Sequence, residues 1–394
     1  MTATTTGPGS QTQKPIDAGS TGAGSGSGDP GSAPRSASAA PFANSLTAGK
    51  LPRRSWLWVL LASWLVMAAV FGVLWAADAA GAFNIVGTLF FGTVLYCVAI
   101  YLLSFFVEGH RKAKDRLVTA LVTSAFVIAL LPLVSLVITT LTNGLPAFLT
   151  PSFFTQSQRN IVGEGGGALH AIVGTLLITG VAALISVPIG LLTAIYLTEY
   201  GRGRLAKAIT FFVDVMTGIP SIVAGLFSFA LFSLLFTDPG IRFGFGGAVA
   251  LSVLMIPVVV RSSEEMLKLV PNELREAAYA LGVPKWLTIV KVVLPTSLAG
   301  IVTGIMISIA RVIGETAPLL IIAGFTASMN YNLFSERMMT LPVFVYTQYA
   351  NQGSDFQAYV DRAWAGALTL VLIVMLLNGL ARLIAKLFSP KFGR

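Results

Sequence analysis

The sequence predicts an all-α, polytopic membrane protein, and three observations lead to this prediction. First, 55% of the 394 residues are hydrophobic and 11% are charged, which leaves too little polar surface for a soluble globule of this length. Second, the apolar residues gather in eight runs, most of them long enough to cross about 30 Å of hydrocarbon. Third, the basic residues lie between these runs, so the net charge of +9 fits membrane topology better than nucleic-acid binding.

The chain begins with a segment, 1–55, that is built almost entirely from Gly, Ser, Ala, Thr and Pro. Few large apolar side chains are present to offset the entropy lost on ordering, so we expect a disordered tail. The first apolar run starts at Trp56 and follows Arg53 and Arg54. Its length of about 20 residues is typical of a membrane helix rather than of a cleaved signal peptide.

Eight membrane helices are expected, of which the sixth is short. They cover 56–75, 85–107, 117–141, 168–198, 208–236, 245–260, 298–324 and 364–388. Pro188, Pro220 and Pro257 fall inside these runs and predict kinks or breaks, because proline removes a backbone donor and crowds the preceding turn. The sharpest is expected at Gly218 and Pro220. Either the kink packs against neighbouring helices, or its freed carbonyls line a polar path.

The distribution of Lys and Arg predicts the orientation. Of 26 such residues, 21 lie on the side of the N-terminus and Arg311 lies inside a run. The other four are Arg159, Arg242, Arg337 and Arg362. By the positive-inside rule both termini are cytoplasmic, in an inner, cytoplasmic membrane. The loops 142–167 and 325–362 are then external. The second, longer loop is a candidate for contact with a partner protein.

The polar segment 261–291 interrupts the apolar pattern on the cytoplasmic side. We expect Asn272 to cap a short helix whose first turns carry Glu273 and Glu276, near the positive end of the helix dipole. The residues predicted to form one narrow apolar face are Leu274, Ala277, Ala278 and Leu281. Gly282 and Pro284 predict the helix end. From the residues alone, this helix lies on the membrane surface or inserts into a soluble partner.

Arg311 and Glu315 are the two charged residues of the seventh run. An arginine near the bilayer centre costs at least about 2.5–3.5 kcal/mol, so something must offset it. Either the two pair with each other at i,i+4 on one helix face, or Arg311 faces a water-filled path and binds an oxyanion while Glu315 orients it. In the second case the carboxylate favours an oxyanion that carries a proton, such as phosphate rather than sulfate.

The polar segment resembles the EAA loop of ABC importer permeases, here at 271–295. The matching residues are Glu276, Ala277, Ala278, Gly282, Leu294 and Pro295, with Val292 where that pattern usually has Ile. The resemblance implies a six-helix type I permease core over 117–394, and a coupling helix that sits in a cleft of a cytoplasmic ATPase. No Gly-x-x-x-x-Gly-Lys-Ser/Thr phosphate loop occurs in this sequence, so the ATPase is expected to be another chain. ATP would bind there, and no cofactor is expected here.

The segments 310–320 and 340–346 resemble PstA-type permeases of the bacterial high-affinity phosphate importer. The resemblance implies a heterodimer with a PstC-type permease, two PstB-type ATPase subunits and an external PstS-type phosphate-binding protein. It also implies that Arg311 and Glu315 match positions implicated in phosphate passage. The segment 56–116, an extra hairpin with its basic connection, departs from the six-span pattern.

Three other functions compete with that of a phosphate permease. The first is a permease for another oxyanion, such as phosphonate or molybdate. The second is a membrane-embedded enzyme, for which the only further buried acid expected is Asp214. His110, His170 and the single Cys97 offer it neither a catalytic centre nor a metal site. The third is a passive channel, which would not need the EAA helix.

Overall fold

The computed structural model describes residues 51–52, 54–77, 84–353 and 355–388, and every regular element in these ranges is helical. The chain divides into two compact units, 1–125 and 126–394. Almost all of the tail expected to be disordered, 1–55, lies outside the described residues.

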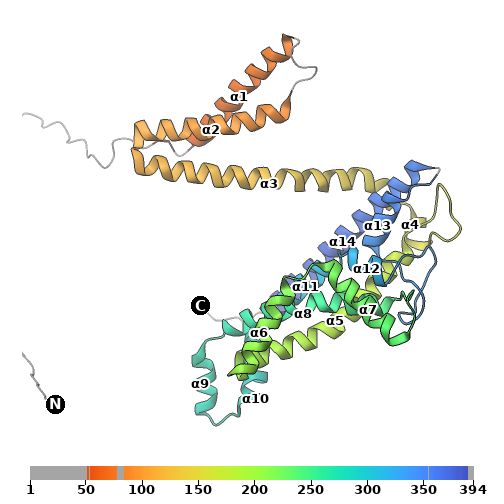
Figure 1. Ribbon diagram of the computed structural model, residues 1–394. Coiled ribbons are helices and arrows are strands. Elements are labelled where there is room, and N and C mark those ends of the chain that lie inside the picture. Colours follow the sequence, from red (N-terminus) through yellow and green to blue (C-terminus); the bar gives the residue numbers. More distant parts are fainter. Residues whose placement is uncertain (1–50, 53, 78–83, 354, 389–394) are drawn as a thin grey trace, which may run out of the picture. The chain divides into compact units, whose positions relative to one another are not determined.

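The first unit is built on a hairpin of α1 (Ser55–Ala76) and α2 (Ile85–Glu108), as predicted (Figure 1). Trp64 packs on Gly92, where an added Cβ would lie 2.5 Å from the indole Cδ1, so the close approach of the two helices needs glycine. Glu108 ends α2 with a nearly buried carboxylate that lies 2.6 Å from Nε of Arg116. This pair links α2 to the start of α3 (His110–Phe148).

The second unit packs around α5 (Leu169–Ile195), α8 (Gly244–Lys268) and α11 (Leu294–Val312) (Figure 1). Its other elements are α4 (Pro151–Thr155), η1 (Tyr196–Tyr200), α6 (Arg204–Thr217), α7 (Ser221–Phe236), α9 (Asn272–Ala280), α10 (Lys285–Thr288), η2 (Ile289–Val293), α12 (Ala317–Ile322), α13 (Leu341–Ala350) and α14 (Phe356–Phe388). Fully buried side chains of Ile178, Leu251 and Met255 form the centre of the core between α5 and α8.

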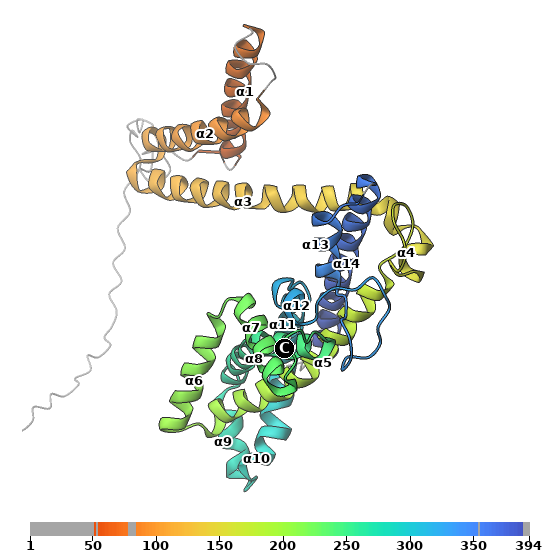
Figure 2. The same ribbon diagram turned by 45° about the vertical axis from the view of Figure 1, so that its right-hand side comes forward.

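Seven helices of the described residues are long and apolar enough to cross a membrane. The fifth predicted run, 208–236, is not one straight span, because the chain bends by 108° between α6 and α7. Figure 2 shows this bend. The break falls at Gly218 and Pro220, as predicted. Pro220 has no N–H for a helical bond and disfavours helical backbone at Ile219. Pro188 and Pro257, in contrast, lie inside the continuous helices α5 and α8.

Several predicted boundaries differ from the structure: α3 extends beyond 117–141 at both ends, and α14 begins at Phe356 rather than at 364. Two further differences concern the site. The sixth run was expected to end at 260, but α8 continues to Lys268, and its last two turns carry charged side chains. The seventh run, 298–324, was expected to be one helix, but α11 ends at Val312 and α12 begins at Ala317. Pro318 contributes to this break, since it has no N–H to donate to the carbonyl of Gly314 and instead occupies the first turn of α12, where proline is tolerated.

Candidate functional site

The polar segment forms the short helix α9, which lies with α10 at one end of the second unit (Figures 1 and 2). The prediction that Asn272 caps α9 is wrong, because Pro271 occupies the N-cap position. The predicted end at Gly282 is confirmed by its φ of +74°. The N–H of Val283 donates to the carbonyl of Ala278 at 3.1 Å, and that of Gly282 to Tyr279 at 2.9 Å. These two bonds form a Schellman motif.

The apolar face predicted for α9 is divided between the core and the surface. Leu274 and Ala278 face the core of the unit, whereas Ala277 and Leu281 are exposed, Leu281 to 83%. The residues exposed along one stripe of α9 and its C-cap are Glu273, Glu276, Ala277, Ala280 and Leu281. Their spacing of three and four residues is that of one helix face. The helix therefore packs through one side and offers a mixed acidic and apolar stripe on the other.

Arg275 holds α9 against the ends of two membrane helices, the one formed by α5 and η1 and the preceding helix α8. Its Nη2 lies 2.9 Å from Oε1 of Glu199 in η1, and both side chains are nearly buried. The same guanidinium donates to the carbonyls of Leu267 at 3.0 Å and Val270 at 2.6 Å. Lys285 of α10 donates to the carbonyl of Glu199. Glu199 was not predicted as a site residue, since only the fold brings it near Arg275, 76 positions away.

A continuous helical segment, 285–312, runs from α10 through η2 and α11 to Arg311. The π-helical turns of η2 end directly before Leu294 and Pro295. Pro295 has no N–H for the carbonyl of Lys291, and a wider turn there accommodates the missing bond. Arg311 lies 18 residues after Val293, about 27 Å along the helix axis. The end of the polar segment and Arg311 therefore lie on one continuous helical segment.

Arg311 and Glu315 lie at the break between α11 and α12 rather than on one helix face. Arg311 is exposed in the last turn of α11, and Glu315 is half-buried beyond the helix end. Across the part of the chain that the structure describes, neither side chain forms an ion pair. The alternative in which the two pair at i,i+4 is therefore wrong. Gly225 packs on Pro318, which brings α7 beside this break.

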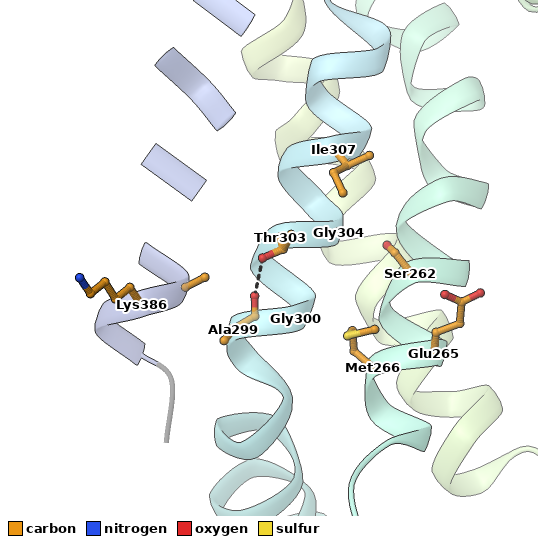
Figure 3. A pocket seen from close by; sticks show the side chains of 10 residues that line it. Ser262, Glu265, Met266, Ala299, Gly300, Thr303, Gly304, Ile307 and Lys386 are labelled. Atoms are coloured by element: carbon orange, nitrogen blue, oxygen red, sulfur yellow. Dashed lines mark hydrogen bonds between the residues drawn. The ribbon is translucent and has the colours of Figure 1, made fainter. Parts of the chain in front are cut away.

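An open groove of about 790 Å³ follows the face of α11 that leads toward Arg311 (Figure 3). Gly300, Gly304 and Ile307 line it, and Arg311 continues their spacing on the same face. Ser262 and Met266 of α8 point toward this face in Figure 3. A Cβ at Gly304 would lie 2.6 Å from Oγ of Ser262, so glycine is needed where α8 and α11 cross.

A charged cluster on the last turns of α8 was also missed. Nη1 of Arg261 lies 2.8 Å from Glu264, and Nζ of Lys268 lies 2.6 Å from the other oxygen of that carboxylate, which is 9% exposed. Arg261 also pairs with Asp214 of α6. The expectation that Asp214 is buried is wrong, because its side chain is 58% exposed. The i,i+3 and i,i+4 spacing of Arg261, Glu264 and Lys268 is the sequence signal that marks this cluster.

Within the described ranges no group of three or more His, Cys, Asp or Glu side chains is placed to hold a metal ion. His170 is buried against Phe344, with ring centroids 5.7 Å apart, and belongs to the packed core.

Comparison with known proteins gives related sequences over most of the chain. The family model described as "Binding-protein-dependent transport system inner membrane component" matches residues 186–394. "Phosphate transport system permease protein PstA 1" of Mycobacterium tuberculosis (strain ATCC 25618 / H37Rv) is 47% identical over 278 residues, 70% of this chain and 88% of that protein. "Phosphate transport system permease protein PstA" of Pasteurella multocida (strain Pm70) is 41% identical over 71% of this chain and 96% of that protein. A solved structure of the MetNI methionine ABC transporter, described as inward facing, is 20% identical, with a TM-score of 0.46 over 56% of this chain and 96% of that one.

Proposed function

Since the chain belongs to the family of binding-protein-dependent transport system inner membrane components, we propose that it is the permease subunit of an ATP-driven importer and that it carries inorganic phosphate. It is a multi-pass membrane protein and a transport subunit, not an enzyme. The naming of both relatives as phosphate transport permeases supports the choice of substrate.

The observation that carries the mechanism is the continuous helical segment 285–312. The exposed stripe of α9, with Glu273, Glu276 and Ala277, docks on an ATPase subunit. Closure of the ATPases moves α9, and the contacts of Arg275 and Lys285 with Glu199 transmit that movement to the membrane helices. The segment then shifts Arg311 at its far end, which exposes the anion path alternately to the two sides of the membrane.

Arg311 and Glu315 are the residues proposed to meet the substrate. The guanidinium offers several donors to the oxygens of phosphate, and the carboxylate accepts a hydrogen bond from the proton that phosphate keeps near neutral pH. Sulfate lacks that proton and is repelled. The break at Gly218 and Pro220 supplies backbone that is free of helical bonds, beside α12, for the same path.

The partners follow from the family. An importer permease of this class works with ATPase subunits and a binding protein, and we assign these as two PstB-type ATPases and an external PstS-type phosphate-binding protein. A PstC-type permease completes the translocation pathway. ATP binds to the ATPase chains, and both termini of this chain face the cytoplasm, in agreement with the distribution of Lys and Arg.

The test is uptake of labelled phosphate by the complete complex in proteoliposomes, for wild type, Arg311→Ala and Glu276→Lys. We expect ATP-dependent uptake in wild type and a loss of at least about tenfold in each variant. Normal uptake in both variants would refute the proposed roles. Competition with phosphonate, molybdate and sulfate separates the oxyanions, and uptake without ATP would indicate a passive channel.

A further inference from the structure

A second hollow, of about 540 Å³, lies at the opposite end of α8 from the coupling helix. It forms where the loop before α8 meets the loop after α12. The lining residues used below are Asp238, Arg242, Glu336 and Arg337. The 25 residues of α8 place this hollow about 37 Å from the cytoplasmic end of that helix. Under the proposed orientation it opens on the external side, and we call it the outer cup.

Two arginines meet over one glycine in the outer cup. A Cβ on Gly324 would lie 3.0 Å from Cδ of Arg242 and 3.3 Å from Cδ of Arg337, so both side chains run across the bare backbone of this residue. Gly324 has φ +72°, a conformation that also favours glycine. Both arginines are exposed, and across the described ranges neither forms an ion pair. Nε of Arg242 donates to the carbonyl of Ile321 at 3.1 Å, which leaves its terminal nitrogens free.

Main-chain bonds fix the loops that carry these side chains. The N–H of Phe243 donates to Ile322 at 2.9 Å, and that of Met338 donates to Ala323 at 3.1 Å. Both arginines therefore stand next to residues tied to the end of α12. Thr237 and Glu336, which precede Asp238 and Arg337, have φ of +54° and +59°. Such backbone conformations are unusual for residues other than glycine and occur more often at ligand-binding sites than elsewhere.

The chemistry of the outer cup matches that of a protonated oxyanion. Two guanidinium groups offer planar sets of donors, which suit the oxygens of phosphate. The carboxylates of Asp238 and Glu336 line the same hollow and can accept a hydrogen bond from the proton that the anion keeps. Asp238 is already oriented by its own turn, where the N–H of Gly240 donates to Oδ1 at 2.8 Å.

The outer cup is connected to the break that carries Arg311. Gly324 lies two residues beyond α12, and α12 begins two residues after Glu315. The six residues of α12 span about 9 Å. On this basis we propose that the outer cup is an entry site that receives inorganic phosphate through Arg242 and Arg337 before it reaches Arg311. This inference rests on the proposed function and adds a second anion site to the path.

The direct test is arginine footprinting with phenylglyoxal on the complete complex in detergent, read by mass spectrometry. Inorganic phosphate at millimolar concentration is expected to slow modification of Arg242 and Arg337 at least about threefold, with sulfate less effective. Arg159 is an exposed arginine that does not line the outer cup, so its rate should not change. Equal rates with and without phosphate would overturn the proposal. Protection that needs the binding protein and not phosphate would also overturn it, and would indicate a protein-docking surface.

A second test separates anion transfer from docking. The double variant R242Q/R337Q is compared with R159Q for ATP-driven phosphate uptake and for stimulation of ATP hydrolysis by the binding protein. We expect uptake to fall at least about tenfold while the half-saturating concentration of binding protein stays within about twofold. Normal uptake, or a large rise in that concentration, would contradict an entry site. If wild type takes up no phosphate, the proposed function fails, while the footprint still decides whether the outer cup binds the anion.

Discussion

Nη2 of Arg275 lies 2.9 Å from Oε1 of Glu199, in a nearly buried ion pair that joins α9 to the end of the membrane helix formed by α5 and η1. A helix of nine residues is too short to be stable alone in water. Its position therefore depends on such contacts and on the packing of Leu274 and Ala278. In the proposed mechanism, this ion pair transmits movement of the ATPase to the membrane helices.

Loss of this ion pair should uncouple ATP hydrolysis from transport. Removal of one partner of a buried pair costs about 3–5 kcal/mol, because the other charge is left without compensation. Arg275→Gln should be the more damaging change, since Arg275 also donates to the carbonyls of Leu267 and Val270. Glu199→Gln leaves those two bonds in place. We expect uptake per ATP hydrolysed to fall in the order wild type, E199Q, R275Q.

The control for this prediction is Arg202→Gln, an exposed arginine three residues from Glu199. It changes the same charge on the same side of the protein without a buried partner, so uptake per ATP should stay near that of wild type. A loss in R202Q equal to that in R275Q would attribute the effect to surface charge and not to the ion pair.

Leu281 should be a main apolar contact of α9 with the ATPase. It is 83% exposed at the C-cap, where a leucine without a partner leaves a large apolar area in water. Leu281→Glu is expected to abolish stimulation of ATP hydrolysis and to weaken co-purification of the ATPase. Leu281→Met keeps the apolar volume and should retain both. Equal behaviour of the two variants would exclude this contact.

Glu315 should determine which oxyanion is accepted. Its carboxylate repels a fully deprotonated anion and accepts a hydrogen bond from one that keeps a proton. Glu315→Gln removes the repulsion, so sulfate should compete with phosphate uptake more strongly than in wild type, by about tenfold or more. The measurement is inhibition of labelled phosphate uptake by sulfate in wild type, in E315Q and in two variants of the outer cup, Glu336→Gln and Asp238→Asn. If E315Q discriminates between phosphate and sulfate as wild type does, residues other than Glu315 determine the selectivity.

Local patterns predicted the membrane helices, the break at Gly218 and Pro220, and the helix end at Gly282, because proline and glycine act on the backbone nearest to them. They did not predict the break after Val312, because the apolar run 298–324 is long enough to be one membrane helix in spite of Pro318. Nor did they predict which side of α9 is buried. That depends on Glu199 and on the core beneath Leu274, which lie far away in the sequence.

The same limit applies to long-range pairs. Arg242 and Arg337 are 95 positions apart in the sequence, and only the fold brings them together over Gly324. Asp214 was expected to be buried because its neighbours are apolar. In a membrane protein, however, apolar neighbours can face lipid or a partner, so burial within the chain does not follow from them.

The crossing of α8 and α11 yields a final prediction, on stability. A Cβ at position 304 would lie 2.6 Å from both Cβ and Oγ of Ser262, inside van der Waals contact. Gly304→Ala should therefore lower the free energy of unfolding by about 1–3 kcal/mol, although alanine favours a helix more than glycine does. Ser262→Gly removes the obstructing atoms, so the double variant G304A/S262G should recover part of the loss. Gly180→Ala is the matched control in α5, because no atom lies within 4 Å of its added Cβ and its stability should be equal or higher. Thermal unfolding of the purified complex measures the stability of G304A, S262G, G304A/S262G and G180A. A double variant no more stable than G304A would show that the contact with Ser262 does not set the distance between these helices.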